Sequence, residues 1–536
     1  MIPTTLIDDF LAAQSTLSAV DRFASADPIT DPTRPPAQAR WYRDLLPASP
    51  PGPGQQYAFR VDLDACSGCK ACVAACHSLN GLDEGESWRS VGTLVGTGDN
   101  ALVQSVTTGC HHCADPGCLS GCPVDAYVKD DDGIVRHLDD QCIGCSYCTL
   151  TCPYEVPRLD DTRGIVRKCD MCHDRLAVGE APACVQACPT EAIAIVTVDL
   201  DDVGTEDWGF AAPSPETTRP ATVFASSRDL ATDVAPVDRH TVTPRHAHPP
   251  LVVMLVLTQL SIGAFVVLEV LRATGAISGS SAGLGSVAAL ATTVVALLAS
   301  LAHLGRPQYA FRAVIGLRHS WLSREIVAFG AFAPLGVLHA ATIDGRWPVA
   351  GLPTGLTGGV ASVVGLVAVA ASMMVYVRTG RQGWGAAEVT TRFALTTATL
   401  GVLAVLVVLA AGTTTDVASG PGHGLAAVGA VLMLISLVPD AWAGRGADPT
   451  TTRGRTAALR RGPLFGLVRL RAGFGLLSVL LAAGAAVVLD DAAPIDAGPS
   501  VVLAAGALVA AVVAELAGRW CFFAAEGSPR MPGALS

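Results

Sequence analysis

Sixteen of the 17 cysteines in this 536-residue chain fall between residues 66 and 188, in four groups that repeat almost the same spacing. Each group begins with two cysteines separated by two residues and ends with two separated by three residues. The groups are Cys66, Cys69, Cys72 and Cys76; Cys110, Cys113, Cys118 and Cys122; Cys142, Cys145, Cys148 and Cys152; and Cys169, Cys172, Cys184 and Cys188. In such a repeat, three thiolates wrap one [4Fe–4S] cube and the fourth reaches a neighbouring cube. The spacing predicts four complete [4Fe–4S] clusters, and four redox centres in so short a segment predict a protein that conducts electrons.

Zinc and disulfides are the alternatives for cysteines at this density. Structural zinc also uses cysteines two residues apart, but a zinc site closes with four ligands and does not require quartets followed by proline, as in Cys122-Pro123. Disulfides need an oxidising compartment. Residues 1–20 contain neither a basic segment nor a twin arginine, and two aspartates interrupt them. We therefore expect the N-terminal half to stay in a reducing compartment.

Charge and hydropathy divide the chain into two unlike halves. Residues 1–247 carry 18 basic and 35 acidic side chains, a net charge of −17, whereas residues 248–536 carry 18 and 12, a net charge of +6. Half of all residues are hydrophobic and only 15% are charged. This composition disfavours a purely soluble protein, and the acidic first half excludes a nucleic-acid binder.

The second half contains eight apolar segments that are long enough to cross about 30 Å of hydrocarbon as helices. They lie near residues 249–271, 284–304, 326–343, 356–377, 392–412, 425–442, 471–489 and 500–518. The sequence therefore predicts a fold in two parts: an α+β ferredoxin-like domain with four cluster-binding motifs, followed by an all-α eight-helix transmembrane bundle. An even number of spans places both ends of the bundle on the same side of the membrane.

The arginines around these spans indicate which side that is, because basic residues gather on the cytoplasmic face. Eighteen arginines are predicted on the side of the cysteine-rich domain, and only Arg272 and Arg346 on the other side. We expect a multi-pass protein of the inner (cytoplasmic) membrane, with the cluster domain and both termini in the cytoplasm.

The rest of the chain is predicted to connect these two parts. Residues 1–54 are expected to form an amphipathic helix and a proline-rich arm. The cluster domain is predicted at 55–196 and the membrane anchor at 249–525. Residues 197–248, rich in proline, threonine and aspartate, are predicted to be an extended linker and surface wrap, and residues 526–536 a C-terminal tail.

Over about residues 55–196, the four groups resemble the iron–sulfur subunit of dimethyl sulfoxide reductase-family molybdoenzymes, including the wide gap between Cys172 and Cys184. In that family the first group pairs with the fourth and the second with the third, so the resemblance implies four ligand sets. They are Cys66, Cys69, Cys72 and Cys188 (the first set); Cys169, Cys172, Cys184 and Cys76 (the second set); Cys110, Cys113, Cys118 and Cys152 (the third set); and Cys142, Cys145, Cys148 and Cys122 (the fourth set).

The resemblance also implies an order, with the first set toward the molybdenum subunit and the fourth toward the membrane. Some relatives carry tryptophan at the position of Cys145 and hold a three-iron cluster there. This chain has cysteine at that position. Four cubes and no trinuclear centre are therefore expected.

The second half carries motifs of the same family. The second predicted span is followed by the motif HLGRP, which starts at His303, and the third opens with SWLSREI, which contains Glu325. The eighth ends with ELAGR, which starts at Glu515. Over about residues 249–525 these motifs resemble the eight-helix membrane anchor of the reductases. The chain thus resembles the electron-transfer and anchor subunits joined into one.

The resemblance implies that the anchor oxidises menaquinol without haem and that His303 and Glu325 serve the quinol site. Ionisable side chains at membrane depth often mark a proton or ligand path, which agrees. His303 would take a quinol proton near neutral pH, and Glu325 would pass it on. The alternative is structural: His303 caps a helix, and Glu325 pairs with Arg324 or Arg318. Paired axial haem ligands are not expected, because His339 is the only other histidine well inside a predicted span.

Four other side chains are expected to be structural. Glu515 and Arg519 lie four residues apart on one predicted helix, so we expect an internal ion pair. Glu269, near the end of the first span, is expected at the membrane interface. Cys521, the seventeenth cysteine, is expected to pack as a small apolar residue.

The sequence contains no P-loop and no Rossmann fingerprint. We therefore expect a separate molybdopterin-containing catalytic subunit as partner, together with membrane lipid and the quinone pool, and no nucleic acid. The leading hypothesis is an electron-transfer and anchor subunit that passes electrons from quinol through four clusters to a cytoplasmic reductase of the dimethyl sulfoxide or nitrate type. The best-known relatives face the periplasm instead.

Two other functions are considered. The same path run in reverse would carry electrons from a formate dehydrogenase- or hydrogenase-type partner to quinone. An ion transporter regulated by a cluster domain is disfavoured, because it needs charged residues in the middle of several spans.

Overall fold

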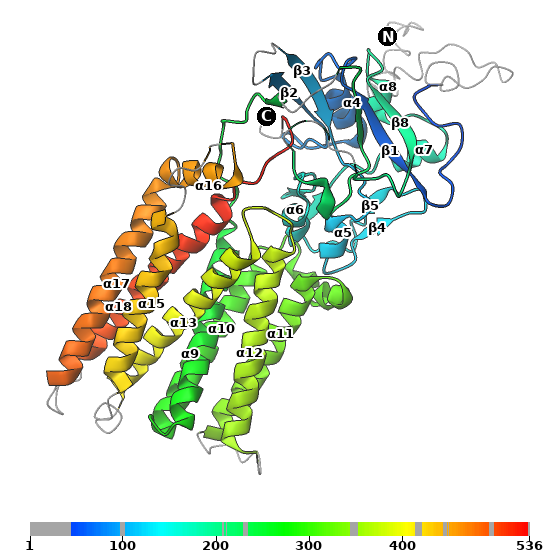
Figure 1. The fold of residues 1–536 in the computed structure, drawn as a ribbon. Helices are drawn as coiled ribbons and strands as arrows, with labels where there is room; N and C mark the ends of the chain where they lie inside the picture. Colours follow the sequence, from blue (N-terminus) through cyan, green and yellow to red (C-terminus); the bar gives the residue numbers. More distant parts are fainter. Residues whose placement is uncertain are drawn as a thin grey trace, which may run out of the picture. The chain divides into compact units, whose positions relative to one another are not determined.

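The computed structural model describes residues 44–96, 102–205, 208, 210, 212–228, 234–343, 352–412, 421–442, 448, 450–491 and 498–533. The predicted N-terminal helix and most of the proline-rich arm lie outside these residues. The chain forms two compact units (Figure 1), of which the first is Met1–Thr241 with Pro529–Ser536 and the second is Val242–Ser528. The sheets belong to the first unit and the long helices to the second, so the predicted fold class is confirmed.

The first unit contains four small sheets in the described residues, with strand orders β8-β1-β9, β10-β2-β3, β4-β5 and β6-β7. Strand β1 buries Tyr57, Phe59 and Val61 on one face, as its alternating sequence predicts. It pairs with β8 in antiparallel register, with Phe59 opposite Ile195. The strands are β1 (Gln55–Asp62), β2 (Ser90–Gly96), β3 (Val103–Thr108), β4 (Tyr127–Lys129), β5 (Val135–His137), β6 (Arg158–Asp160), β7 (Ile165–Arg167), β8 (Ile193–Asp199), β9 (Val223–Ala225) and β10 (Val234–Pro236).

The third cysteine of each group lies in a short helix of the first unit, and the fourth lies in that helix or within two residues of its end. Cysteines four positions apart lie one helical turn from each other, which explains the constant three-residue gap. In α5, for example, Cys118 lies inside the helix and Cys122 caps its end. The helices are α4 (Ala71–Asn80), α5 (Gly117–Gly121), α6 (Tyr147–Thr151), α7 (His173–Ala177), α8 (Ala183–Gln186) and the 3-10 turn η1 (Pro215–Thr217).

Two connecting segments pack on the first unit. The predicted linker, 197–248, contributes β9 and β10, which pair with β1 and β2. It is therefore largely part of the first unit, because these short strands cover edges that would otherwise expose unpaired backbone groups. The predicted C-terminal tail also packs on the first unit, where Met531 is 4% exposed and the backbone of Pro532 lies against Gly92.

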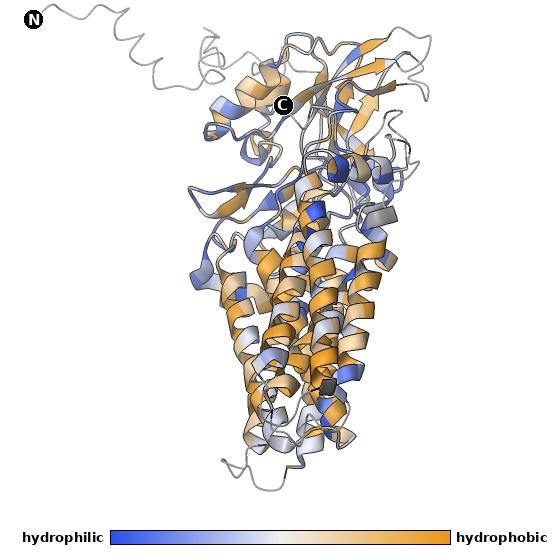
Figure 2. Ribbon diagram, turned by 90° about the vertical axis from the view of Figure 1, so that its left-hand side faces the viewer, coloured by the Kyte–Doolittle hydropathy of each residue, from blue (hydrophilic) through white to orange (hydrophobic). Residues whose placement is uncertain are grey.

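The second unit contains, within its described residues, eight helices that are long and apolar enough to cross a membrane, as predicted. Figure 2 shows hydrophobic residues along most of their length. Two shorter elements, the 3-10 helix η2 (Pro307–Arg318) and α16 (Thr452–Arg461), were not predicted. The long helices are α9 (Pro249–Ala273), α10 (Gly279–Leu301), α11 (Trp321–Ile343), α12 (Thr354–Val377), α13 (Ala386–Ala411), α15 (Pro421–Trp442), α17 (Phe465–Asp491) and α18 (Gly498–Ala524).

Helices α9 and α13 form the centre of this bundle. In their most apolar stretches 72% and 67% of residues are buried, against 22–44% in the other six. They approach so closely that a Cβ atom added to Gly401 would lie 2.3 Å from the carbonyl carbon of Gly263. The outer helices expose large apolar side chains such as Leu284, Leu480 and Val502. An apolar outer face suits a lipid environment.

Successive long helices run in opposite directions, so polar residues near their ends gather at two places. We call the end where α9 begins and α10 ends the His303 end. The other end of the bundle, where α9 and α11 finish and α12 begins, is called the opposite end.

Candidate iron–sulfur centres and quinol site

The structure brings the sixteen cysteines together in the four sets defined above. In the first set, burial raises the pKa of the Cys66 thiol, and the neighbouring thiols of Cys72, Cys188 and Cys69 raise it further. In the second, burial and then the thiols of Cys184 and Cys172 raise the pKa of Cys76 to about 12. In the third set, burial and then the thiols of Cys152, Cys110 and Cys118 raise the pKa of Cys113. In the fourth, burial and then the thiols of Cys145, Cys122 and Cys142 raise the pKa of Cys148.

Tight loops aim backbone N–H groups at the first cysteine of a group. Gly144 has φ 68° and Ser146 has φ 56°, so the chain after Cys142 turns through the left-handed region. The Gly144 N–H donates to Cys142 Sγ at 3.4 Å, and the Met171 N–H donates to Cys169 Sγ at the same distance. Such donors stabilise thiolate ligands and orient them toward a common centre.

The Sγ atom of the last cysteine of a group also accepts a hydrogen bond from a backbone N–H group. The Ala126 N–H donates to Cys122 Sγ at 3.3 Å, and the Ala192 N–H donates to Cys188 Sγ at 3.3 Å. In both cases proline follows the cysteine and bends the chain back, which brings the donor four residues later over the sulfur.

These residues fit [4Fe–4S] clusters. All 17 cysteines are free. A small cavity of about 20 Å³ is lined by the four cysteines of the third set. Thiols buried this deeply stay protonated unless a cation compensates their charge, and the iron of a cube would do so. Ligation of iron by the sixteen cysteines stays a prediction.

Neighbouring sets approach one another in a row. The thiol of Cys72 raises the pKa of Cys184, after the larger effect of burial, and that of Cys110 raises the pKa of Cys169. The first set therefore adjoins the second, and the second adjoins the third. The buried Tyr127 lies between the third and fourth sets, because its pKa is raised by burial and then by thiols of both.

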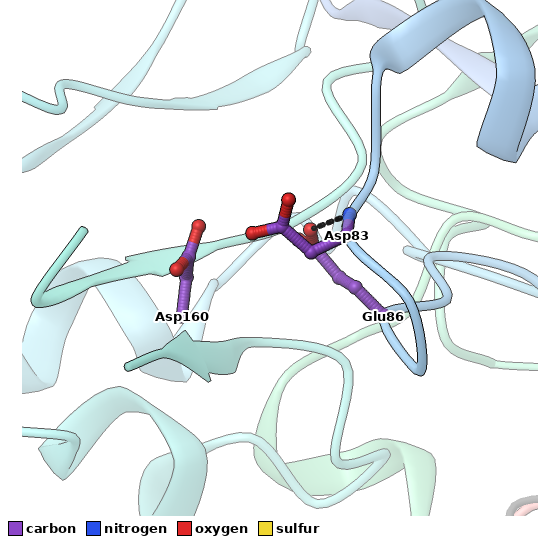
Figure 3. A group of neighbouring side chains, drawn as sticks. All are labelled: Asp83, Glu86 and Asp160. Carbon is purple, nitrogen blue, oxygen red and sulfur yellow. Dashed lines mark hydrogen bonds between the residues drawn. The ribbon is translucent and has the colours of Figure 1, made fainter. Parts of the chain in front are cut away.

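An acidic group near β6 is the other candidate for a metal site. Asp83, Glu86 and Asp160 bring three carboxylates together (Figure 3). However, Arg167 Nη1 lies 2.9 Å from Glu86 Oε2 and 3.8 Å from Asp160 Oδ2, and Arg163 Nε lies 3.3 Å from Asp160 Oδ2. These guanidinium groups already balance the carboxylates, so the group is structural.

The structure places the two predicted quinol-site residues at the His303 end. Glu325, in α11, is 3% exposed and adjoins Ser372 of α12. Arg324 points away from it and donates to the carbonyl oxygens of Leu317 at 3.2 Å and Arg318 at 2.6 Å. The predicted alternative, an ion pair with Arg324 or Arg318, is therefore wrong, and Glu325 has no cationic partner among the described residues.

His303 follows the last turn of α10. Burial lowers the pKa of His303 despite its hydrogen bond to the backbone of Ser300, so the imidazole is neutral at pH 7 and ready to accept a proton. Nδ1 has no hydrogen-bond partner among the described residues. The structure, within its described residues, shows no hydrogen bond or ion pair between His303 and Glu325.

Sequence reasoning missed the neighbour of His303. Burial, then His246 and His303, lower the pKa of His248 to about 4, so these histidines lie close together. The motif HAHPP before the first span was the available signal.

A second polar cluster lies at the opposite end. His339 Nε2 is 2.7 Å from Glu269 Oε1, and Arg272 Nη2 is 2.9 Å from Glu269 Oε2. His339 Nδ1 bonds to the Thr357 hydroxyl at 3.1 Å. Glu269 is 7% exposed, and its two partners come from its own helix and from α11. Its position at the membrane interface stays a prediction.

The expected pair of Glu515 with Arg519 is also wrong. Glu515 accepts from Thr396 at 2.7 Å and lies 3.5 Å from Arg471, whereas Arg519 donates to Gln259 at 2.9 Å. Spacing along one helix allowed the pair, but partners on other helices are nearer. Cys521 is buried and 4% exposed, as expected of a packing residue.

Two stretches of the chain match known protein families. Residues 102–198 match the family described as a 4Fe-4S dicluster domain. Residues 245–441 match the family described as the DMSO reductase anchor subunit (DmsC).

Individual proteins are similar to the iron–sulfur half. The B subunit of the anaerobic dimethyl sulfoxide reductase of Escherichia coli (strain K12) is 37% identical over 170 residues, which cover 30% of this chain and 82% of that protein. The thiosulfate reductase electron transfer subunit PhsB of Salmonella typhi is 40% identical over 152 residues, 28% of this chain and 79% of that protein. The formate dehydrogenase-O iron–sulfur subunit of Escherichia coli (strain K12) is 38% identical over 162 residues, 26% of this chain and 52% of that protein.

Proposed function

Because this chain belongs to the dimethyl sulfoxide reductase-type molybdoenzyme family and joins its iron–sulfur and membrane-anchor subunits in one polypeptide, we propose that it carries electrons from menaquinol to a separate molybdopterin-containing catalytic subunit. The chain is the electron-transfer and anchor part of a molybdoenzyme complex. We propose in addition that quinol is its substrate, that it holds four clusters and that electrons flow from quinol to the catalytic subunit.

The sixteen cysteines would hold four [4Fe–4S] cubes, which supply one-electron transfer when bound. The protein's part is to fix the sulfur atoms in a row of four adjoining sets. Backbone donors such as the N–H groups of Gly144 and Met171 orient the thiolates. Burial keeps water away from most of these sulfur atoms, whereas Cys69 of the first set is exposed.

Oxidation of a quinol releases two electrons and two protons, so the site needs proton acceptors as well as a path for electrons. Neutral His303 is suited to accept one proton. Glu325, in its apolar surroundings, is suited to hold the other or to pass it on past Ser372. A buried carboxyl group without a cationic partner is costly within a membrane span and is expected to serve a function. The burial of Glu325 without a cationic partner among the described residues is the main observation in support of the proposed quinol site.

Electron flow from quinol to the catalytic subunit is supported because both halves of the chain are similar to subunits of dimethyl sulfoxide reductases. The anchor half matches the anchor family of dimethyl sulfoxide reductases, and the iron–sulfur half is similar to the B subunit of such an enzyme. A specific observation favours the alternative direction, from a dehydrogenase partner to quinone, since a formate dehydrogenase subunit is 38% identical to the same half. Reduction potentials of the clusters against that of menaquinone distinguish the two directions.

The arginine distribution supports a cytoplasmic position for the cluster domain and both termini. If quinol protons are released on the face that consumes them, turnover transfers little net charge across the membrane. We expect proteoliposomes to develop no large membrane potential during turnover. A large potential would argue against this sidedness.

The test of the proposed function is reduction of the purified, full-length protein by a menaquinol analogue under anaerobic conditions. Wild-type protein should contain iron and sulfide, and its iron–sulfur absorption should bleach on addition of the quinol. His303→Gln and Glu325→Gln should slow bleaching by about 100-fold, the usual effect of removing an acid–base group, with iron content unchanged.

Matched controls are His423→Gln, which lies where α15 begins at the opposite end, and Glu388→Gln, whose carboxylate is 46% exposed. Both should bleach at the wild-type rate. Iron-free wild-type protein, or bleaching at equal rates in all variants, would contradict the proposal.

A further inference from the structure

Buried polar side chains occupy the places where successive cysteine sets adjoin. Between the first and second sets lies Arg89, which is 4% exposed. Its Nη1 donates to Thr107 Oγ1 at 3.3 Å, and Thr107 Oγ1 lies 3.5 Å from Cys72 Sγ of the first set. The positive charge of Arg89 also opposes the effect of burial on the pKa of Cys184, so the guanidinium group lies near that thiol of the second set. One buried cation therefore lies next to both sets.

Lys168 occupies the corresponding position between the second and third sets, and it is 3% exposed. Its Nζ lies 3.6 Å from Cys110 Sγ of the third set and donates to the carbonyl oxygen of Cys169, in the second set, at 2.8 Å. A further bond to the carbonyl of Val135 fixes the ammonium group.

Three further polar side chains adjoin the sets, namely His112, Tyr127 and His137. His112 accepts the Val135 N–H at Nδ1 (3.1 Å), so its proton sits on Nε2, 4.0 Å from Cys169 Sγ. Tyr127 lies between the third and fourth sets. The fourth set adjoins His137, whose Nδ1 is 2.8 Å from the carboxylate of Asp139.

We propose that Arg89 and Lys168 are positioning residues for electron transfer, whose buried charges raise the reduction potentials of the cubes at the second and third sets and draw electrons away from the fourth. Reduction of a cube adds one electron and no proton, so the new negative charge has to be stabilised by its surroundings. A cation within hydrogen-bond distance of a ligand sulfur stabilises it most strongly where water is excluded. The second set gains most, because both cations lie next to it.

This inference rests on the proposed function, since it requires the clusters. It does not depend on whether quinol is the reductant. Without Arg89 or Lys168, the affinity of the adjacent cube for its electron should fall by about tenfold, which for a one-electron couple is a shift of about 59 mV to lower potential.

The test is an anaerobic redox titration of the full-length protein in detergent, followed by EPR. Arg89→Gln keeps a donor for Thr107 and removes the charge; it should lower the potential of the centre at the second set. Lys168→Met keeps the length of the side chain, and it should lower the potentials at the second and third sets. Neither variant should shift the fourth centre. Arg60→Gln, an exposed residue of β1, is the control and should shift none.

Rescue by a conservative variant separates charge from packing. Arg89→Lys retains the cation and should restore a potential close to that of the wild type, whereas a purely structural role predicts no such recovery. If Arg89→Gln does not incorporate all its iron, Lys168→Met decides the question, because its site is distinct.

The outcomes are distinguishable from failure of the proposed function. Wild-type protein without iron or without EPR signals on reduction overturns the function itself. Variants with full iron content and all potentials equal to those of the wild type overturn only the role of the two cations.

Discussion

A buried carboxylate at the end of α18 provides a quantitative test of the anchor's architecture. The side chain of Glu526 is 0% exposed, and its Oε2 lies 2.9 Å from Arg245 Nε and 3.2 Å from Arg381 Nη1. The two arginines are 10% and 3% exposed. They precede α9 and α13, so one carboxylate joins the starts of both central helices to the end of α18.

Glu526→Gln removes the negative charge and leaves two buried guanidinium groups facing a neutral amide. Breaking a buried ion pair in this way costs about 3–5 kcal/mol, because the remaining charge is desolvated and unpaired. For a domain of this size, about 4 kcal/mol corresponds to a fall in Tm of roughly 8–16 °C.

The matched control is Glu388→Gln. Glu388 lies 3.1 Å from Arg392, but its side chain is 46% exposed, so the loss should be at most about 1 kcal/mol. Thermal unfolding of the detergent-solubilised protein at pH 7, followed by tryptophan fluorescence, measures both variants. Equal Tm values for the two variants would refute the reasoning from burial.

The pH dependence of this effect has a defined sign. The pKa of Glu526 is lowered by Arg245 and Arg381, which outweigh the opposing effect of burial. Its contribution to stability is therefore fully present above the unfolded-state pKa of about 4.5 and is lost as the pH falls through the lower folded-state value. The difference in Tm between wild type and Glu526→Gln should shrink as the pH falls below about 4.5.

Three further predictions address packing and titration. Gly401→Ala places a methyl group 2.3 Å from the α9 backbone and should lower the stability of the bundle by roughly 1–3 kcal/mol or more, whereas Gly330→Ala, with open space around it, should not; thermal unfolding compares them. His248, with its pKa lowered to about 4 by burial and nearby histidines, should destabilise the fold by ~1–2 kcal/mol as the pH falls from 6.5 toward 4, and His248→Gln should flatten that part of the stability profile. Gly92→Val should displace the C-terminal segment from β2, because its Cβ would lie 2.3 Å from Pro532, and carboxypeptidase should then shorten the variant faster than the wild type.

Local spacing made much of this protein predictable from its sequence. Cysteines four positions apart lie on one helical turn, as in α5, and segments of about twenty apolar residues form long helices. His303 and Glu325 were singled out by the resemblance to the reductase anchor, with which the cost of ionisable groups at membrane depth agrees. The spacing did not reveal the partners of those side chains.

The tertiary structure decided which residues far apart in the sequence contact one another. The contacts of Arg89 and Lys168 come from residues far apart in the sequence, and no motif marks either side chain. Glu515 had a plausible partner four residues away, yet it faces Arg471 of another helix. Periodicity and spacing are properties of neighbours along the chain, whereas the environment of a buried charge depends on every element packed around it. The sequence by itself therefore determined which residues can serve as ligands and spans, and only the folded chain determined which charges surround them.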